Sequence, residues 1–294
     1  MEDRLTVVCC EGNINEVKNI LDNNNINITS DMLNKVLLTN AYTNGFIEIV
    51  KYLIEYGNTH NINIDIHVFG DSPFIDACRY GHIEIIKYLI EYGETHNNKI
   101  NIHIRNDYAF IIACKRGYIE IVKYLIEYGE KINNQIQEYI NYQFAMNYAC
   151  EQGHLSIIEY LLEYLHKNNI YILIKYLFTL ACQYGRINVI KYLVEYGEKN
   201  NDKMDILNTP CEPLLDILNK KSYTESLLYI KYLKLHNYIS LDIRRFYKYN
   251  KNMLISKYIY NTCNIPVKYI IHNNIHNNLS YYMDIVNIDY CFNF

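Results

Sequence analysis

The chain has 294 residues, of which 50% are apolar and 20% are charged, and its formal net charge is −4. This is the composition of a folded protein with ample material for a core, and its charge excludes an overall positive field for nucleic acid or an anionic membrane. The acidic start, residues 1–4, is not that of a signal peptide, and the longest apolar run, residues 170–182, is too short to span a bilayer. We therefore expect a soluble protein of the cell interior without nucleic-acid or membrane partners.

An internal repeat organises most of the chain. The motif Lys-Tyr-Leu-Ile-Glu-Tyr-Gly or a near copy of it occurs five times, at residues 51–57, 87–93, 123–129, 159–165 and 191–197. A second glycine precedes each copy, and these glycines recur every 32–36 residues from Gly12 to Gly185. A period of this length with two helical stretches in each unit predicts an array of stacked helix pairs. We expect residues 1–33 to form a degenerate N-terminal capping repeat and residues 34–209 to form five full repeats.

The first half of the unit at residues 70–93 predicts a short helix. Ser72 and Pro73 are expected to start it, because a hydroxyl caps free N–H groups and proline suits the first helical turn. Gly81 is expected to end it, because only glycine adopts a positive φ at low cost. The apolar face between them consists of Phe74, Ala77 and Cys78.

The second half of the unit predicts a longer helix over residues 83–92. The apolar residues at helical spacing form one buried stripe, which comprises Ile85, Ile86, Leu89 and Ile90. The charged residues Glu84, Lys87 and Glu91 lie on the opposite, solvated side. Gly93 is expected to end this helix as Gly81 ends the first, and residues 94–105 to form an extended excursion with a turn.

Residues 70–93 read Gly-x-Ser-Pro-Phe-x-x-Ala-Cys-x-x-Gly-His-Ile-Glu-Ile-Ile-Lys-Tyr-Leu-Ile-Glu-Tyr-Gly. This string resembles the ankyrin repeat, whose consensus is G-x-T-P-L-H-x-A-A-x-x-G-H-x-E-V-V-K-x-L-L-x-x-G. The resemblance implies an all-α repeat fold, an ankyrin-type solenoid of stacked helix–turn–helix pairs joined by hairpin loops. It also implies a non-catalytic protein that mediates protein–protein interactions. The Tyr-rich and Asn-rich composition is similar to that of ankyrin proteins of giant DNA viruses of amoebae, which implies host partners in the host cytoplasm.

The chain departs from the consensus in one respect that affects packing. The histidine of the Thr-Pro-Leu-His motif, which ties neighbouring repeats in the family, is absent from all four copies of the motif. We expect apolar packing to replace that polar network. Three-residue insertions before residues 70 and 106 lengthen the hairpins on one edge.

The C-terminal part is less regular. Residues 210–294 are expected to be degenerate helical repeats and a C-terminal cap, because a terminal repeat must cover an exposed apolar face. Residues 264–270, Asn-Ile-Pro-Val-Lys-Tyr-Ile, faintly resemble the opening of an F-box. The alternative function is therefore an adaptor that recruits substrates to a ubiquitin ligase.

Tyrosine is abundant, with 32 residues. Ten of them form pairs four residues apart in the second helices: Tyr52, Tyr56, Tyr88, Tyr92, Tyr124, Tyr128, Tyr160, Tyr164, Tyr192 and Tyr196. A phosphorylation array or a stacking platform for bases is one interpretation. Packing on the outer helical layer is favoured, because the spacing follows the helix period.

Cysteine and histidine indicate no metal centre. Four cysteines, at 78, 114, 150 and 182, occupy one position of successive repeats, and helical layers about 8–10 Å apart separate them too widely for a disulfide or a shared zinc ion. We expect reduced thiols, no metal and no cofactor. His67 and His103 either pair on the binding edge or are solvated hairpin residues, and the second interpretation is favoured. The absence of a catalytic motif favours a protein that is not an enzyme.

The candidate partner-binding surface is the concave face of a monomeric array. Hairpin tips and first-helix ends carry side chains that differ between otherwise similar repeats, and Tyr and Arg are common interface anchors. The candidates at the tips are Phe69, Asp71, Arg105, Asp107, Tyr142 and Gln143. Those at the helix ends are Arg79, Tyr80, Lys115, Arg116, Glu151, Gln152, Gln183 and Tyr184.

Overall fold

The computed structural model describes residues 2–22, 28–36, 41–132 and 139–200. They belong to two compact units, residues 1–173 and residues 174–294, which we describe separately. The expected repeats of residues 210–294 and the segment 264–270 lie outside the described residues.

The described residues are helical and contain no strand. In the first unit the helices are α1 (Glu2–Glu11), α2 (Ile14–Asp22), α3 (Ser30–Val36), α4 (Tyr42–Asn44), α5 (Ile47–Thr59), α6 (Val68–Tyr80), α7 (Ile83–Thr95), α8 (Ile104–Arg116), α9 (Ile119–Lys131), α10 (Tyr139–Gln152) and α11 (Leu155–Lys167). In the second unit they are α12 (Ile174–Gln183) and α13 (Ile187–Lys199). The expected solenoid of helix pairs is confirmed. None of these helices has the length and apolarity needed to cross a membrane.

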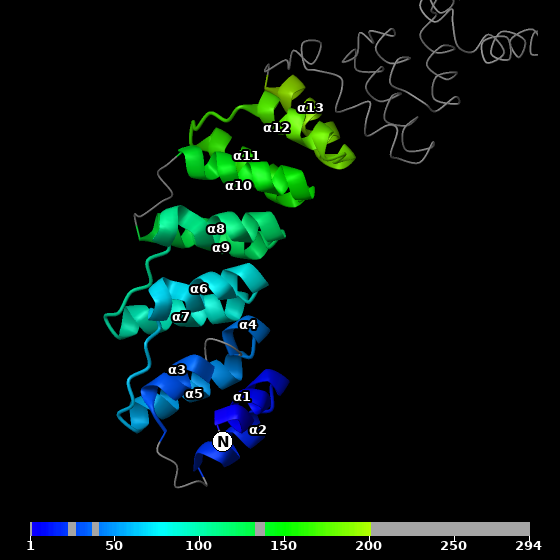
Figure 1. Ribbon diagram of the computed structural model, residues 1–294. Helices are drawn as coiled ribbons and strands as arrows, with labels where there is room; N and C mark the ends of the chain where they lie inside the picture. Colours follow the sequence, from blue (N-terminus) through cyan, green and yellow to red (C-terminus); the bar gives the residue numbers. More distant parts are fainter. Residues whose placement is uncertain (1, 23–27, 37–40, 133–138, 201–294) are drawn as a thin grey trace, which may run out of the picture. The chain divides into compact units, whose positions relative to one another are not determined.

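Within the first unit the helix pairs α6/α7, α8/α9 and α10/α11 are stacked in succession (Figure 1). The first helices α6, α8 and α10 pack against one another along much of their length, whereas the second helices α7, α9 and α11 touch their neighbours at fewer points.

The core follows the predicted stripes. Ile85, Ile86, Leu89 and Ile90 of α7 are all buried, and so is the apolar face of α6. On the opposite side of α7, the Lys87 ammonium lies 3.0 Å from the Glu84 carboxylate and both side chains are exposed. The amphipathic assignment of the second helix is therefore confirmed.

The two glycines of the unit have different roles. Gly81 has a φ of +89° and ends α6, as predicted. Gly93 does not end α7, because the helix continues to Thr95. A β-carbon on Gly93 would lie 2.5 Å from the carbonyl oxygen of Asn98, so this position needs glycine because the following segment folds closely over it.

The connections between repeats are built from turns and buried isoleucines. After α5 the amide of Ile62 donates to the carbonyl of Gly57 over 2.8 Å, and Ile64 and Ile66 are then buried. The next connection buries Ile100 and Ile102 in the same alternating way. The excursion predicted over residues 94–105 is shorter than expected, because α7 continues to Thr95 and α8 begins at Ile104. The alternating isoleucines of this shorter segment add side chains to the core.

The tyrosines of each pair pack against one another, and those of α7 and α9 also contact the preceding repeat. Their ring centroids lie 6.0–6.4 Å apart within each pair. The hydroxyls of Tyr92 and Tyr128 reach the preceding repeat, where they donate to Asn58 Oδ1 over 3.2 Å and to Glu94 Oε1 over 3.1 Å. This geometry supports the packing interpretation of the tyrosine pairs.

Candidate functional site

Two tips and three helices form one continuous surface of the first unit. The tips are residues 67–71 and 103–107, and the helices are α6, α8 and α10. We call their exposed side the first-helix surface. Most of the residues that the sequence predicts to bind a partner belong to these elements.

Both tips have an unusual backbone. Residues 69–71 have φ values of 53°, 68° and 58°, and residues 105–107 have φ values of 52°, 57° and 57°. A left-handed residue other than glycine costs about 1–2 kcal/mol, and such strain persists only where neighbouring contacts hold it. The expected helix start is correspondingly different: the hydroxyl of Ser72 donates to Asp76 Oδ2 over 3.3 Å and does not cap the helix.

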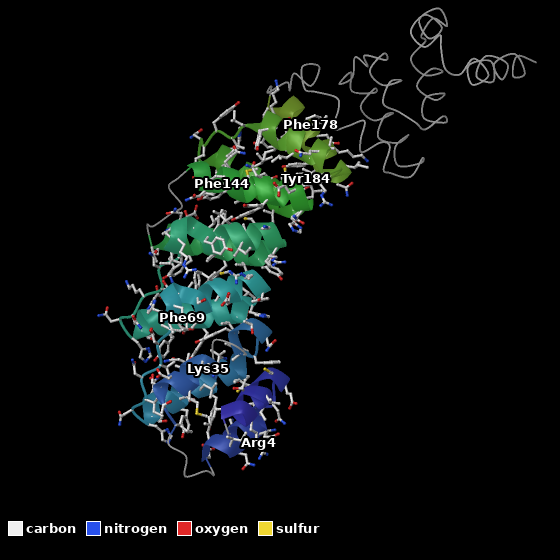
Figure 2. All side chains as sticks on the ribbon, in the orientation of Figure 1. Arg4, Lys35, Phe69, Phe144, Phe178 and Tyr184 are labelled. Carbon is white, nitrogen blue, oxygen red and sulfur yellow. The ribbon has the colours of Figure 1, made fainter. Side chains whose placement is uncertain are left out.

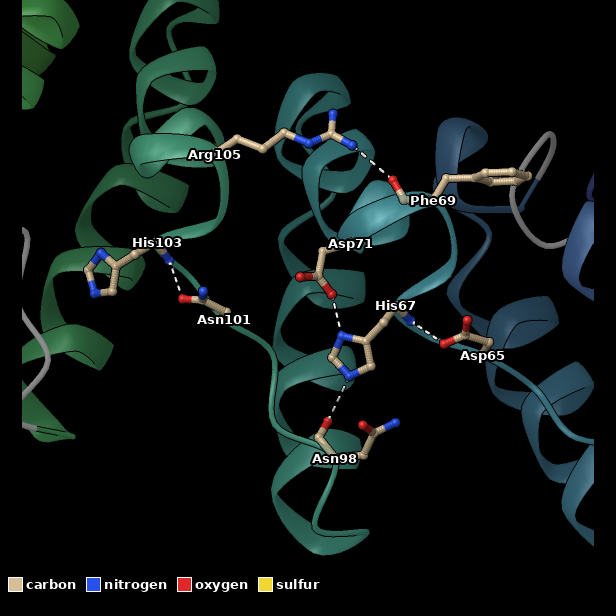
Figure 3. Close-up of polar contacts among 8 residues, drawn as sticks. All are labelled: Asp65, His67, Phe69, Asp71, Asn98, Asn101, His103 and Arg105. Atoms are coloured by element: carbon tan, nitrogen blue, oxygen red, sulfur yellow. Dashed lines mark hydrogen bonds and ion pairs between the residues drawn. The ribbon is translucent and has the colours of Figure 1, made fainter.

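A histidine holds each tip. Nδ1 of His67 hydrogen-bonds Asp71, and Nε2 faces the carbonyl oxygen of Asn98 in the next repeat at 3.2 Å (Figure 3). Both partners accept, so only the doubly protonated ring donates both bonds. Partial burial lowers the pKa of His67, but the hydrogen bond and charge of Asp71 outweigh it, and the net shift is upward.

The second tip repeats this arrangement. His103 Nδ1 hydrogen-bonds Asp107, whose other oxygen accepts from Asn141 Nδ2 of α10 over 2.6 Å. The interpretation of His67 and His103 as solvated hairpin residues is therefore wrong. The expectation that apolar packing alone replaces the family's polar network is also wrong, because these tips supply polar links between repeats.

The two tips are also joined to each other. Nη2 of Arg105 donates to the carbonyl oxygen of Phe69 over 2.8 Å. The Phe69 ring points away from these polar contacts (Figure 3) and is 77% exposed. Asp65, the exposed carboxylate beside this tip, accepts a hydrogen bond from the His67 amide over 2.8 Å. The tip thus presents an aromatic side chain on a well-supported backbone.

Exposed side chains also gather at the ends of the first helices. Tyr80 is 46% exposed, and Lys115, Arg116 and Gln152 are exposed as well. Two of the cations have contacts within the array: Arg79 Nη1 donates to Asp76 Oδ1 over 2.8 Å, and Lys115 Nζ lies 4.7 Å from the Tyr148 ring centroid. Arg79 and Glu151 are half-buried.

Three predicted contact residues are buried and cannot meet a partner directly. Asp71 and Asp107 are each 5% exposed, because the left-handed turn directs them toward the histidine of their own tip. Tyr142 is 2% exposed and packs against Phe110 in a T-shaped arrangement, with ring centroids 5.7 Å apart. It lies inside α10, which is helical where α6 and α8 have a tip.

The remaining candidates are divided between the two units. Gln143 is half-buried and its amide donates to Asn147 Oδ1 over 2.9 Å. Gln183 and Tyr184 are exposed at the end of α12 in the second unit.

Sequence reasoning missed Phe144, which is 48% exposed on α10 (Figure 2). It also missed Tyr108 and Ile111, which are half-buried on α8. Ser72, Tyr108 and Phe144 occupy one position of the repeat, 36 residues apart. The sequence did contain a signal for these residues, because this position takes a large aromatic residue in two repeats where the ankyrin consensus has threonine.

The described side chains present little redox or metal chemistry. No group of three His, Cys, Asp or Glu residues within them is arranged to hold a metal ion. Cys78, Cys114 and Cys150 are buried. Burial also raises the pKa of the Cys9 thiol to about 12, with a smaller contribution from Cys10, so Cys9 stays protonated near neutral pH.

Comparison with known families agrees with this architecture. The family profile of ankyrin repeats (three copies) matches residues 5–102, 94–172 and 110–205. The chain belongs to the ankyrin-repeat family. Comparison of this ankyrin-repeat protein with curated proteins gave no match. Among solved structures, the crystal structure of the human ASB11 ankyrin repeat domain matches with 22% sequence identity and a TM-score of 0.49, over 70% of this chain and 85% of that one.

A second set of histidines links the ankyrin repeats on the side of the helix ends. His82 Nε2 lies 2.8 Å from the carbonyl oxygen of Thr43, and His154 Nε2 lies 3.1 Å from that of Lys115. Each histidine follows the glycine that ends a first helix and reaches the corresponding helix end of the preceding repeat. Ankyrin repeats generally serve as protein-binding modules. The histidine links between repeats help to hold the repeats in place beneath such a binding surface.

Proposed function

We propose that this ankyrin-repeat protein is a non-catalytic scaffold that binds another protein through the first-helix surface. The observation that carries the proposal is the exposure of Phe69, Tyr80 and Phe144 on tips and helices whose other faces are packed into the core. A large part of each of these aromatic side chains is open to solvent, although the Tyr80 ring also stacks on His82. Large aromatic side chains are enriched among the residues that dominate interface energies.

The support beneath this surface favours tight binding. The tip backbone at Phe69 is held by Arg105, and the tip histidines link successive repeats. A surface that is ordered before binding loses little conformational freedom on association, so more of the contact energy contributes to affinity.

The proposal extends to the cellular setting. We take the binding form to be a monomer in the cytoplasm, and the compositional similarity to viral ankyrin proteins makes a host protein the expected partner.

Affinity capture with the full-length protein tests the proposed surface. The double variant Tyr80→Ala with Arg116→Ala removes two exposed side chains from the first-helix surface, and the control Glu91→Ala with Glu127→Ala changes the second helices. We expect the first pair to weaken binding of the captured partner at least about tenfold, in the range of interface hot spots. Unchanged binding by the first variant, or equal loss by the control, contradicts the proposal.

The adaptor alternative depends on residues 264–270, which lie outside the described residues. Capture with the full chain and with a chain that ends at residue 237 separates the two roles. An adaptor loses ligase components on truncation while its other partners remain, whereas a simple scaffold shows the same partners in both experiments.

A further inference from the structure

Positive charge on the first-helix surface is concentrated on α8. This helix carries Arg105, Lys115 and Arg116, all exposed, and its one carboxylate, Asp107, is buried against His103. In contrast, each of the second helices α5, α7, α9 and α11 has more glutamates than lysines. The array is therefore acidic on its outer layer and basic along the middle of the first-helix surface.

The neighbouring repeats limit this basic strip to one helix. In α6 the position equivalent to Lys115 is Arg79, which is paired with Asp76 over 2.8 Å. In α10 the equivalent position is Glu151. A ligand that follows the positive charge must therefore lie along α8.

Apolar side chains occupy the centre of the strip. Tyr108, Ile111 and Lys115 are spaced i, i+3 and i+7, so they lie on one face of α8, and the first two are half-buried. Phe69 and Phe144, from the adjacent repeats, are the most exposed phenylalanines of the first-helix surface. The strip is thus cationic at both ends with Tyr108 and Ile111 between them, and Arg79 of α6 hydrogen-bonds the Tyr108 side chain.

The dimensions of the strip suit a short extended peptide. Arg105 precedes Lys115 by ten residues. The regular helix from Tyr108 to Lys115 accounts for about 10 Å of this at 1.5 Å of rise per residue, and the left-handed tip extends the separation to roughly 15 Å. An extended chain covers the same length with about five residues.

We infer that α8 is the docking site for an acidic peptide segment of the partner, in which two acidic residues about five positions apart flank an apolar or aromatic residue. This inference rests on the proposed function and specifies its partner. One carboxylate meets Arg105 at the tip, and the other meets Lys115 and Arg116 at the helix end. The apolar side chain contacts Tyr108 and Ile111. Arginine–carboxylate pairs at a partly desolvated surface supply register and strength.

Two other occupants fit the charge less well. Residues 201–294 of this chain contain eleven Lys and Arg against eight Asp and Glu, so that segment has the same sign of charge as the strip. Binding of a single-stranded nucleic acid needs a continuous row of cations that contact successive phosphates, in addition to aromatic side chains that stack on the bases. Here Asp76 and Glu151 flank the strip on either side, and the outer layer is acidic.

Peptide selection on the full-length protein tests the inference. A displayed library of random twelve-residue peptides is selected on the wild type, and recovered peptides are synthesised with a fluorescein label. We expect the recovered sequences to be at least twofold enriched in Asp and Glu over the library. Fluorescence anisotropy should show at least tenfold weaker binding when their acidic residues are changed to Asn and Gln, and weaker binding as salt rises.

Variants of the protein locate the site. Lys115→Glu with Arg116→Glu should weaken binding at least tenfold. Lys51→Glu with Lys87→Glu makes the same change in net charge on the second helices and should alter binding less than twofold. The swap Lys115→Arg with Arg116→Lys keeps both charges and should retain binding within a few-fold, which shows that the charge at these positions is recognised and not the identity of either side chain.

The outcomes distinguish this inference from the proposed function. If the recovered peptides are not acidic but bind the Tyr80→Ala, Arg116→Ala variant more weakly than the wild type, the inference is wrong and the proposed binding surface is still supported. Acidic peptides that bind the charge-reversed variant as well as the wild type overturn the inference too, and so does displacement by a twelve-nucleotide single-stranded RNA that binds more tightly. If no peptide is recovered, or none depends on the first-helix surface, the inference fails, and the affinity capture with its Tyr80→Ala, Arg116→Ala variant decides the proposed function separately.

Discussion

Two phenylalanines with opposite exposure provide a stringent test of the packing. Phe110 on α8 is 1% exposed and packs against the Tyr142 ring in a T-shaped arrangement, whereas Phe69 at the tip is 77% exposed. Phe110→Ala forfeits the burial of an aromatic side chain, worth about 1.5–3 kcal/mol, and the aromatic pair, worth about 0.5–1.5 kcal/mol. With the cavity that remains, we expect a loss of about 4 kcal/mol in unfolding free energy. Phe69→Ala should change it by less than about 0.5 kcal/mol.

Urea denaturation followed by far-UV circular dichroism measures both changes, since the chain contains no tryptophan to serve as a fluorescence probe. The slope of each transition should stay the same if only stability changes. A loss below about 1 kcal/mol for Phe110→Ala, or comparable losses for both variants, would refute the assignment of buried and exposed faces on α6 and α8.

Three further predictions concern the tip and the thiols. Phe69→Gly should raise the unfolding free energy by about 1 kcal/mol by relieving a left-handed residue, while Phe144→Gly in the regular helix α10 should lower it by about 0.5–1 kcal/mol; a loss at both positions in urea melts would argue against strain at the tip. Because the pKa of His67 is raised in the folded protein, its stabilising effect should be complete below its ordinary pKa of about 6.5 and disappear as pH rises through the folded value. The stability difference between wild type and His67→Gln should thus be larger at acidic than at alkaline pH, and a difference that grows with pH would contradict the raised pKa. Burial raises the pKa of the Cys114 thiol well above its ordinary value, so a thiol reagent should label exposed Cys10 in the native protein and Cys114 only on unfolding; equal labelling rates would show that the core opens readily.

The repeating part of the structure was predictable because its determinants are local. The apolar stripe of α7 and the glycine that ends α6 follow from helical spacing and from the φ preference of a single residue. The candidate surface was predicted in part. Phe69, Tyr80 and Arg116 are exposed as expected, because each lies at an element end that the helix period leaves outside the core.

The features that could not be predicted from the sequence depend on contacts between segments that are distant in the chain. Gly93 lies inside a helix because the segment at Asn98 folds over it, and no local rule contains that close approach. The left-handed turns at the tips reverse the direction of side chains that a regular helix start would leave in solvent. They bury Asp71 and Asp107 and leave Phe69 and Arg105 at the surface.

In the described repeats, the sequence by itself determined the spacing of the helix pairs and the amphipathic faces of the second helices, since these depend on residues within a few positions of each other. Only the tertiary structure decided which tip residues are available to a partner. Their orientation is held by hydrogen bonds to groups in the next repeat, from His67 to Asn98 and from Arg105 to Phe69. Partners about 30–36 residues apart in the chain become neighbours only when the repeats stack, because each repeat buries its apolar face against the next.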